Sequence, residues 1–281
     1  DKFVTVREAI SHLPAIVPGA QNSIDPMLMT AHHKLSTLET IRQIPKNGGS
    51  RPKGVGPECL DRVRGFYDVY GRLSWDRPSI TITAYARNPA SGRFVHPEQD
   101  RGLSVREAAI LQSFPNYYMF DGPFDSKFSQ IGNAVPPRFA SFIAGYLVGE
   151  LASSIQFPLS YQGIEVSKPI TNSYSSKIAS SKMNRISNAN IKPTAVDAFC
   201  GAGGLSLGLQ RAGFAVQLSY DSNQIAVETY RKNLGDQVIL ADANQIDISG
   251  RLRKKQKTDL TLFAGGPPCQ GFSVQRRGAD A

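Results

Sequence analysis

The sequence predicts an α/β fold in which a parallel sheet carries the functional residues, beside a smaller region with little regular structure. In the second half of the chain, short apolar runs alternate with helical patterns, which is typical of parallel sheets covered by helices. The first of these runs leads into a glycine-rich turn at residues 201–204, and the last leads into Gly-Gly-Pro-Pro-Cys at residues 265–269. Because open α/β sheets bind ligands at the carboxyl ends of their strands, we expect the functional site there.

Composition limits the class of function. The 281 residues include 32 Lys and Arg against 23 Asp and Glu, and the net charge of +9 suits a polyanionic partner such as nucleic acid. No apolar run is long enough to span a bilayer, so we expect no membrane association. Cys59, Cys200 and Cys269 are widely spaced and form no zinc pattern with the four histidines, which predicts a reducing compartment and no metal site.

Two capping boxes predict helix starts in the first half. Thr5 is followed three residues later by Glu8, and Ser104 by Glu107, the spacing at which each side chain can bond the other residue's backbone N–H. Pro115 is expected to end the second of these helices.

Other segments are assigned from periodicity and composition. Residues 36–43 and 138–151 are predicted helices, and the alternation of Ile80 and Ile82 with threonines predicts a strand at 80–83. Residues 46–54 form a basic loop that we expect to be flexible; it could lie along phosphates, or it could simply be solvated. Residues 153–190 are rich in serine and asparagine, the composition of a linker.

In the second half, each predicted strand ends at a polar or reactive residue. The strand that begins near residue 195 enters the glycine turn, the strand at 216–220 ends at Asp221, and the strand at 238–240 is followed by Asp242. A carboxylate about 20 residues after such a turn can bind ribose hydroxyls. Either aspartate could instead be an ordinary loop or capping residue, but their places at successive strand ends favour a ligand site.

The last predicted strand, 259–264, delivers Cys269. Pro267 and Pro268 fix their own φ angles and lack N–H donors, so the turn is rigid and cannot pair as a strand. A thiol held at this edge suggests nucleophilic catalysis, although most free cysteines are small buried apolar residues. These residues alone do not decide between the two interpretations.

A resemblance decides it. The sequence Gly-Gly-Pro-Pro-Cys-Gln-Gly-Phe-Ser at 265–273 resembles the catalytic motif of the C5-cytosine DNA methyltransferases, and Asp-Ala-Phe-Cys-Gly-Ala-Gly-Gly at 197–204 resembles their first motif. Residues 78–115 and 130–140 resemble the ninth and tenth motifs. The last two motifs precede the first in this chain, so the order is that of a circular permutation. The resemblance covers most of residues 1–152 and 191–278.

The resemblance implies an S-adenosylmethionine-dependent methyltransferase with a Rossmann-like α/β sheet and a smaller target-recognition region. It divides the chain into a partial target-recognition region at 1–77 and a segment with the ninth and tenth motifs at 78–152, which packs on the catalytic domain. A flexible linker at 153–190 follows. Residues 191–281 are then the half that binds S-adenosylmethionine and carries the catalytic cysteine.

The resemblance also implies the reaction and its residues. Cys269 would add to C6 of a cytosine flipped out of double-stranded DNA, which activates C5 for methylation. A compact enzyme of this kind is typical of bacterial restriction–modification systems, so a cytoplasmic, nucleoid-associated location is expected. The residues that match cofactor-contacting positions of the family are Phe199, Gly201, Gly203, Leu205, Asp221, Asp242, Pro268 and Asn133.

Two parts of the family pattern are absent. Neither the Glu-Asn-Val motif nor the Gln-x-Arg-x-Arg motif follows Cys269, so we expect a second polypeptide or a further segment to supply them. The half-sheet by itself is expected to expose an apolar edge. The alternatives are a non-catalytic DNA-binding or regulatory subunit and a tRNA cytosine-5 methyltransferase. The intact Pro-Pro-Cys-Gln argues against the non-catalytic subunit. The Gln-Gly-Phe-Ser that follows Cys269 argues against the tRNA enzyme.

Overall fold

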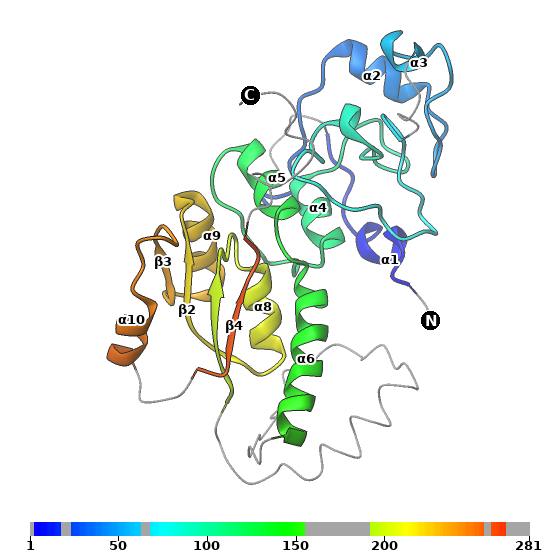
Figure 1. The fold of residues 1–281 in the computed structure, drawn as a ribbon. Coiled ribbons are helices and arrows are strands. Elements are labelled where there is room, and N and C mark those ends of the chain that lie inside the picture. Colours follow the sequence, from blue (N-terminus) through cyan, green and yellow to red (C-terminus); the bar gives the residue numbers. More distant parts are fainter. Residues whose placement is uncertain (1–2, 18–23, 63–67, 155–191, 256–259, 268–281) are drawn as a thin grey trace. The chain divides into compact units, whose positions relative to one another are not determined.

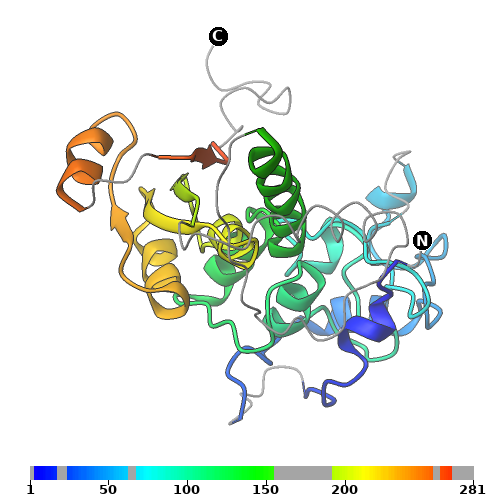
Figure 2. The same cartoon turned by 90° about the horizontal axis from the view of Figure 1, so that it is seen from below.

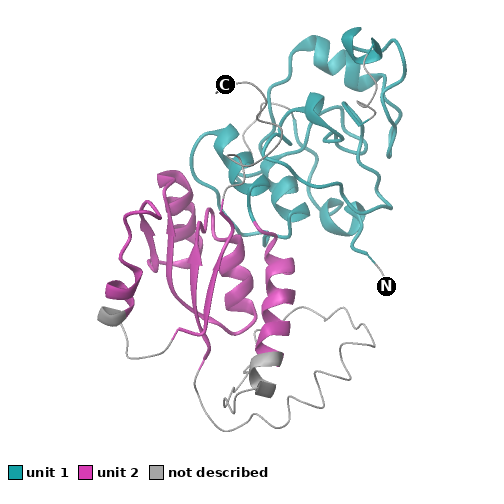
Figure 3. Ribbon diagram, in the orientation of Figure 1, with its two compact units in different colours: residues 1–134 teal, residues 135–281 magenta. Residues whose placement is uncertain are grey.

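The computed structural model describes residues 3–17, 24–62, 68–154, 192–255 and 260–267. It divides into two compact units, Asp1–Ala134 and Val135–Ala281 (Figure 3). The boundary falls inside the segment 78–152: the ninth-motif stretch, 78–115, lies in the first unit, and the tenth-motif stretch, 130–140, is divided between the two units. Nearly all of the predicted linker lies outside the described residues.

The second unit is built on a four-stranded parallel sheet with the order β3-β2-β1-β4 (Figure 1). This confirms the predicted α/β fold. The order reverses between β1 and β4, because the chain crosses the sheet after β3. The strands are β1 (Thr194–Ala198), β2 (Ala215–Asp221), β3 (Val238–Leu240) and β4 (Leu262–Gly265), and the helices between them are α8 (Gly204–Arg211), α9 (Gln224–Leu234) and α10 (Ile248–Lys255).

The register brings the carboxyl ends of β1 and β4 together. Ala198 pairs with Gly265, so the chain leaves β4 beside the turn that follows β1. A reversal of strand order opens a crevice at this edge in α/β sheets, and ligands bind there. The geometry of the sheet therefore places the candidate site at the ends of β1 and β4.

Helix α6 (Pro137–Ser154) packs on the same face of this sheet as α8, and the two helices lie side by side in both views (Figures 1 and 2). An added Cβ at Gly208 of α8 would lie 2.3 Å from the Cβ of Ala140, so only glycine allows this approach. Ala144 of α6 shares an apolar cluster with Ala195 of β1 and Leu209 of α8. Helix α10 covers the other face, where Leu252 packs against the cluster of Val196 and Leu218.

The first unit consists of short helices joined by long irregular segments. Both predicted capping boxes form, at Thr5–Glu8 and Ser104–Glu107. Within the described part of the chain no helix has the length and hydropathy needed to cross a membrane. The elements are α1 (Val6–Ile10), α2 (Leu35–Arg42), α3 (Cys59–Arg62), the 3-10 helix η1 (Pro89–Ser91), α4 (Val105–Leu111) and α5 (Phe124–Gly132).

Buried arginines stabilise this unit. Arg72 is fully buried and donates to the carbonyls of Ile41, Ile44, His96 and Gln99 and to Asp100. Irregular segments leave carbonyl oxygens without helix or sheet partners, and a guanidinium supplies five N–H donors to satisfy them.

One prediction for this unit is wrong. Residues 80–83 form no strand, because no neighbouring segment among the described residues pairs with them; the alternation reflects only that Ile82 is buried between exposed threonines. Residues 46–54 form a loop, as predicted, and Arg93 donates to the carbonyls of Gly48 and Gly49 and to the Ser50 hydroxyl within it. The contact of this loop with phosphates stays a prediction. Helix α5 was not predicted.

Candidate functional site

The turn between β1 and α8 has a backbone that few side chains tolerate. Gly201 and Gly203 have φ values of 51° and 92°, and Phe199 also has a positive φ of 55°, an uncommon and costly conformation for a bulky residue. The Cys200 N–H donates to the Tyr220 carbonyl at 3.1 Å, which ties the turn to β2. An added Cβ at Gly201 would meet no atom of the described residues within 4 Å, so these residues leave space over the turn.

Asp221 joins the turn to the end of β2. One carboxylate oxygen accepts the Gly201 N–H at 2.8 Å and the other accepts the Asn223 N–H at 2.8 Å. The Ala241 N–H donates to the Asp221 carbonyl at 3.0 Å, which holds the end of β3 beside it. Asp242 follows, exposed, with its carboxylate accepting the Asn244 N–H. The structure thus brings together Gly201 and Asp221, with Asp242 at the next strand end.

The other predicted cofactor contacts differ in their surroundings. Phe199 is 37% exposed, and its ring centroid lies 6.0 Å from that of Tyr220, so an aromatic face is available at the turn. Leu205 packs against the apolar cluster that α6 and α8 share. Asn133 is the exposed C-cap of α5 and belongs to the first unit. Pro268 and Cys269 lie outside the described residues.

Four buried polar side chains near the turn were not singled out from the sequence. Ser206 donates to Asp197 at 2.6 Å, and the Tyr230 hydroxyl lies 3.0 Å from Ser206 and 2.8 Å from Ser219. Burial raises the pKa of Asp197 to about 7 and that of Tyr230 to about 12. One feature of the sequence indicates this cluster: Asp197 places a carboxylate inside the apolar run of residues 195–199.

Cys200 lies in the turn but is a poor candidate nucleophile. Its thiol is buried, and burial, with the nearby charges of Asp197 and Asp221, raises its pKa far above the usual range. The reactive thiolate is therefore disfavoured at this position. The described residues contain no group of three His, Cys, Asp or Glu side chains arranged to hold a metal ion.

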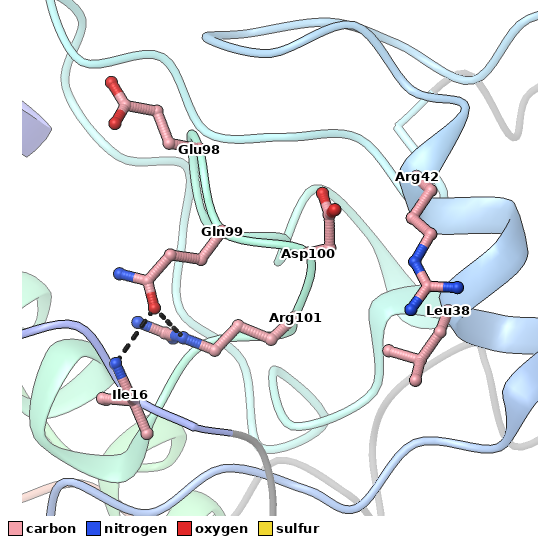
Figure 4. A pocket seen from close by; sticks show the side chains of 7 residues that line it. All are labelled: Ile16, Leu38, Arg42, Glu98, Gln99, Asp100 and Arg101. Atoms are coloured by element: carbon pink, nitrogen blue, oxygen red, sulfur yellow. Dashed lines mark hydrogen bonds between the residues drawn. The ribbon is translucent and has the colours of Figure 1, made fainter.

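A pocket of about 370 Å³ lies in the first unit, between α2 and residues 98–101 (Figure 4). Most of its polar lining is already engaged: the Gln99 side-chain oxygen accepts from the Ile16 N–H and from Arg101, and Asp100 pairs with Arg72 and Lys46. These groups hold loops together, so the pocket offers little chemistry. Its lining residues are Ile16, Leu38, Arg42, Glu98, Gln99, Asp100 and Arg101.

Comparison with known proteins agrees with the geometry of the second unit. Residues 20–149 and 194–281 match the family model of the C-5 cytosine-specific DNA methylases. The chain is 39% identical over 157 residues to the type II methylase M.HgiDII of Herpetosiphon aurantiacus, covering 51% of this chain and 43% of that protein. It is 50% identical over 104 residues to the type II methyltransferase M.AgeI of Thalassovita gelatinovora, covering 37% and 24%.

A plant protein is also similar. DNA (cytosine-5)-methyltransferase 3 of Arabidopsis thaliana is 34% identical over 168 residues, covering 50% of this chain and 12% of that protein. In each of these comparisons the match spans less than half the length of the relative.

Proposed function

The chain belongs to the C-5 cytosine-specific DNA methylase family, and on that premise we propose that it transfers a methyl group from S-adenosylmethionine to C5 of cytosine in double-stranded DNA. The observation that carries the proposal is the meeting, at one sheet edge, of an open glycine turn, the Asp221 carboxylate and the strand that leads to Pro-Pro-Cys. The relatives named type II enzymes favour a role in restriction–modification.

The residues at the turn suit a nucleoside cofactor. The open space over Gly201 admits a ligand close to the backbone, and the half-exposed Phe199 ring offers a face for adenine. Asp221 is the candidate for the ribose hydroxyls and Asp242 for the adenine amino group. Leu205, Pro268 and Asn133 remain predicted contacts by their match to the family motifs. When bound, S-adenosylmethionine supplies an electrophilic methyl group on a sulfonium.

Cys269 is the proposed nucleophile. Its thiolate adds to C6 of the flipped-out base, forming an S–C6 bond and giving C5 the electron density that it lacks in the free base. With S-adenosylmethionine bound, C5 would take the methyl group as the methyl–sulfur bond of the sulfonium breaks and S-adenosylhomocysteine leaves. Transfer of the C5 proton to a base and cleavage of the S–C6 bond would then release the Cys269 thiolate and 5-methylcytosine. The two prolines before the cysteine fix their own φ angles, which supports the proposal of a positioned thiol.

We further propose that residues 78–152 and 191–281 form one methyltransferase domain in permuted order, with 1–77 as part of the target-recognition region. The close packing of α6 on α8 at Gly208 supports the permuted order, because α6 begins within the tenth-motif stretch and α8 begins at the last residue of the first-motif stretch.

The Glu-Asn-Val and Gln-x-Arg-x-Arg motifs are proposed to act from a further polypeptide segment. In the described sheet β4 pairs with β1 alone, and Phe263 of β4 is 52% exposed. An apolar strand at the edge of a parallel sheet is usually covered. This observation supports continuation of the sheet beyond β4.

The test is transfer of labelled methyl from S-adenosylmethionine to mixed-sequence double-stranded DNA by the full 281-residue chain. Activity should disappear in Cys269→Ser and persist in Asp236→Asn, which changes an exposed residue before β3 to which the proposal assigns no role. A chain that is inactive alone but active with a polypeptide carrying the two absent motifs would establish a divided enzyme. Transfer to tRNA in preference to DNA, or no transfer in any arm, would refute the proposal.

A further inference from the structure

Four buried side chains form a hydrogen-bonded cluster that connects the strand before the glycine turn to the helix after it. Asp197 lies on β1 two residues before Phe199, and Ser206 lies in the first turn of α8, three residues after Gly203. Ser219 of β2 and Tyr230 of α9 complete the cluster, and all four side chains are inaccessible to solvent. They are therefore out of reach of a ligand, and the proposed chemistry uses none of them.

The hydrogen bonds of the cluster are directed toward Asp197. Each hydroxyl has a single proton to donate. Ser206 donates its proton to one Asp197 oxygen at 2.6 Å, so the 3.0 Å contact between Ser206 and Tyr230 uses the tyrosine proton. Ser219, 2.8 Å from the Tyr230 oxygen, then donates to it. The chain of donors runs from β2 through α9 and α8 and ends at the carboxylate on β1.

Asp197 also takes the place of a helix cap. The N-cap residue of α8 is Gly203, which has no side chain to accept the free N–H groups of the first turn. The Asp197 carboxylate accepts the Ser206 N–H as well as its hydroxyl. Its other oxygen, Oδ1, is buried with no hydrogen-bond partner among the described residues, a costly arrangement that apolar packing alone would not select.

We propose that Asp197 is a positioning residue for the nucleoside site: its carboxylate, acting through Ser206, holds the glycine turn in the ligand-binding conformation and makes ligand affinity depend on its ionisation. The inference rests on the proposed function, because it takes the turn as the cofactor site. Ionised, the carboxylate accepts both Ser206 donors strongly. Protonated, it carries an extra O–H with no acceptor and holds the first turn of α8 more weakly.

The proton equilibrium lies in an accessible range. Burial is the largest cause that raises the pKa of Asp197 to about 7, and the charge of Asp221 on β2 raises it further, against the hydrogen bonds from Ser206. The other titratable groups that interact with it are Cys200 of the turn, Tyr220 of β2 and Tyr230 of α9. A buried negative charge favours a cationic ligand, and S-adenosylmethionine carries one more positive charge than S-adenosylhomocysteine. The methyl donor should therefore gain more affinity from ionisation than the product does.

The experiment is calorimetric titration of the full chain with S-adenosylmethionine and with S-adenosylhomocysteine between pH 5.5 and pH 8.5. The affinity for S-adenosylmethionine should rise on the order of fivefold across a midpoint near 7, and by less for S-adenosylhomocysteine. Asp197→Asn keeps the acceptor for Ser206 but cannot ionise, so its profile should be flat. Asp236→Asn, at an exposed position before β3, is the matched control and should keep the wild-type profile.

A second variant keeps the test decisive if Asp197→Asn does not fold. Ser206→Ala removes a hydrogen bond that lowers the pKa of Asp197, so the affinity midpoint should move to higher pH. A purely structural role would leave the midpoint in place. An unchanged midpoint, a wild-type profile in Asp197→Asn, or pH-independent binding by the native chain overturns the inference alone. No binding of either nucleoside at any pH overturns the proposed cofactor site and the inference together.

Discussion

The packing of α6 on α8 can be tested by the substitution Gly208→Ala. The added Cβ would lie 2.3 Å from the Ala140 Cβ, 2.7 Å from the Ser141 nitrogen and 2.8 Å from the Pro137 carbonyl oxygen. Two of these three neighbours are backbone atoms of α6, so no side-chain rotation relieves the clash. The helices must separate by about 1 Å to restore an ordinary carbon contact of about 3.5 Å.

The magnitude follows from two opposed terms. Alanine is better than glycine inside a helix by about 1 kcal/mol. Overpacking of a core contact costs about 1–3 kcal/mol, and contact with backbone puts this case at the upper end. The net result should be a destabilisation of about 2 kcal/mol, which corresponds to a fall of about 4–8 °C in the Tm of a unit of this size.

The assay follows the second unit separately from the first. Hydrogen exchange in the β1–α8 region reports on the second unit, while fluorescence of the single tryptophan, Trp75, reports on the first and serves as an internal reference. Gly145→Ala is the matched control, because Gly145 is also a glycine of this helix pair but no atom in the described part of the chain lies within 4 Å of its added Cβ. This substitution should stabilise the unit by up to about 1 kcal/mol. If Gly208→Ala behaved like Gly145→Ala, the packing of α6 on α8 described above would be refuted.

Two predictions concern the first unit. Glu107→Gln should destabilise it by about 3–5 kcal/mol in urea unfolding, because Arg101, fully buried and bonded to Glu107 at 2.7 and 2.8 Å, would lose its charged partner. Glu58→Gln, in an exposed ion pair, should change the free energy of unfolding little, and equal effects of the two substitutions would contradict this account. Burial lowers the pKa of His96 to about 4. In the unfolded chain His96 binds a proton near pH 6.5, whereas in the folded chain it stays neutral until the pH is about 4. The free energy of unfolding should therefore fall, by up to about 3 kcal/mol, as the pH is lowered from 6.5 toward 4. His96→Gln should remove this part of the pH dependence of the unfolding midpoint and exposed His32→Gln should not; an unchanged profile in His96→Gln would show that another group is responsible.

Local features of this protein could be read from the sequence because each depends on neighbours along the chain. The capping boxes at Thr5 and Ser104 need only a partner three residues away, and both form. The glycine turn after β1 and the carboxylate at the end of β2 follow from strand periodicity and the positions of Gly201 and Asp221. The strand predicted at 80–83 failed for the complementary reason, since a strand also requires a partner from elsewhere in the chain.

The sequence by itself therefore determined the fold class, the glycine turn and the cysteine motif that point to a methylase. Only the tertiary structure decided that Asp197 has Ser206 as its donor and that Tyr230 and Ser219 extend the chain of hydrogen bonds. It also decided that α6 packs at Gly208. These contacts join residues on different elements, and whether a buried carboxylate finds a donor depends on how two strands and two helices pack, which no local spacing specifies.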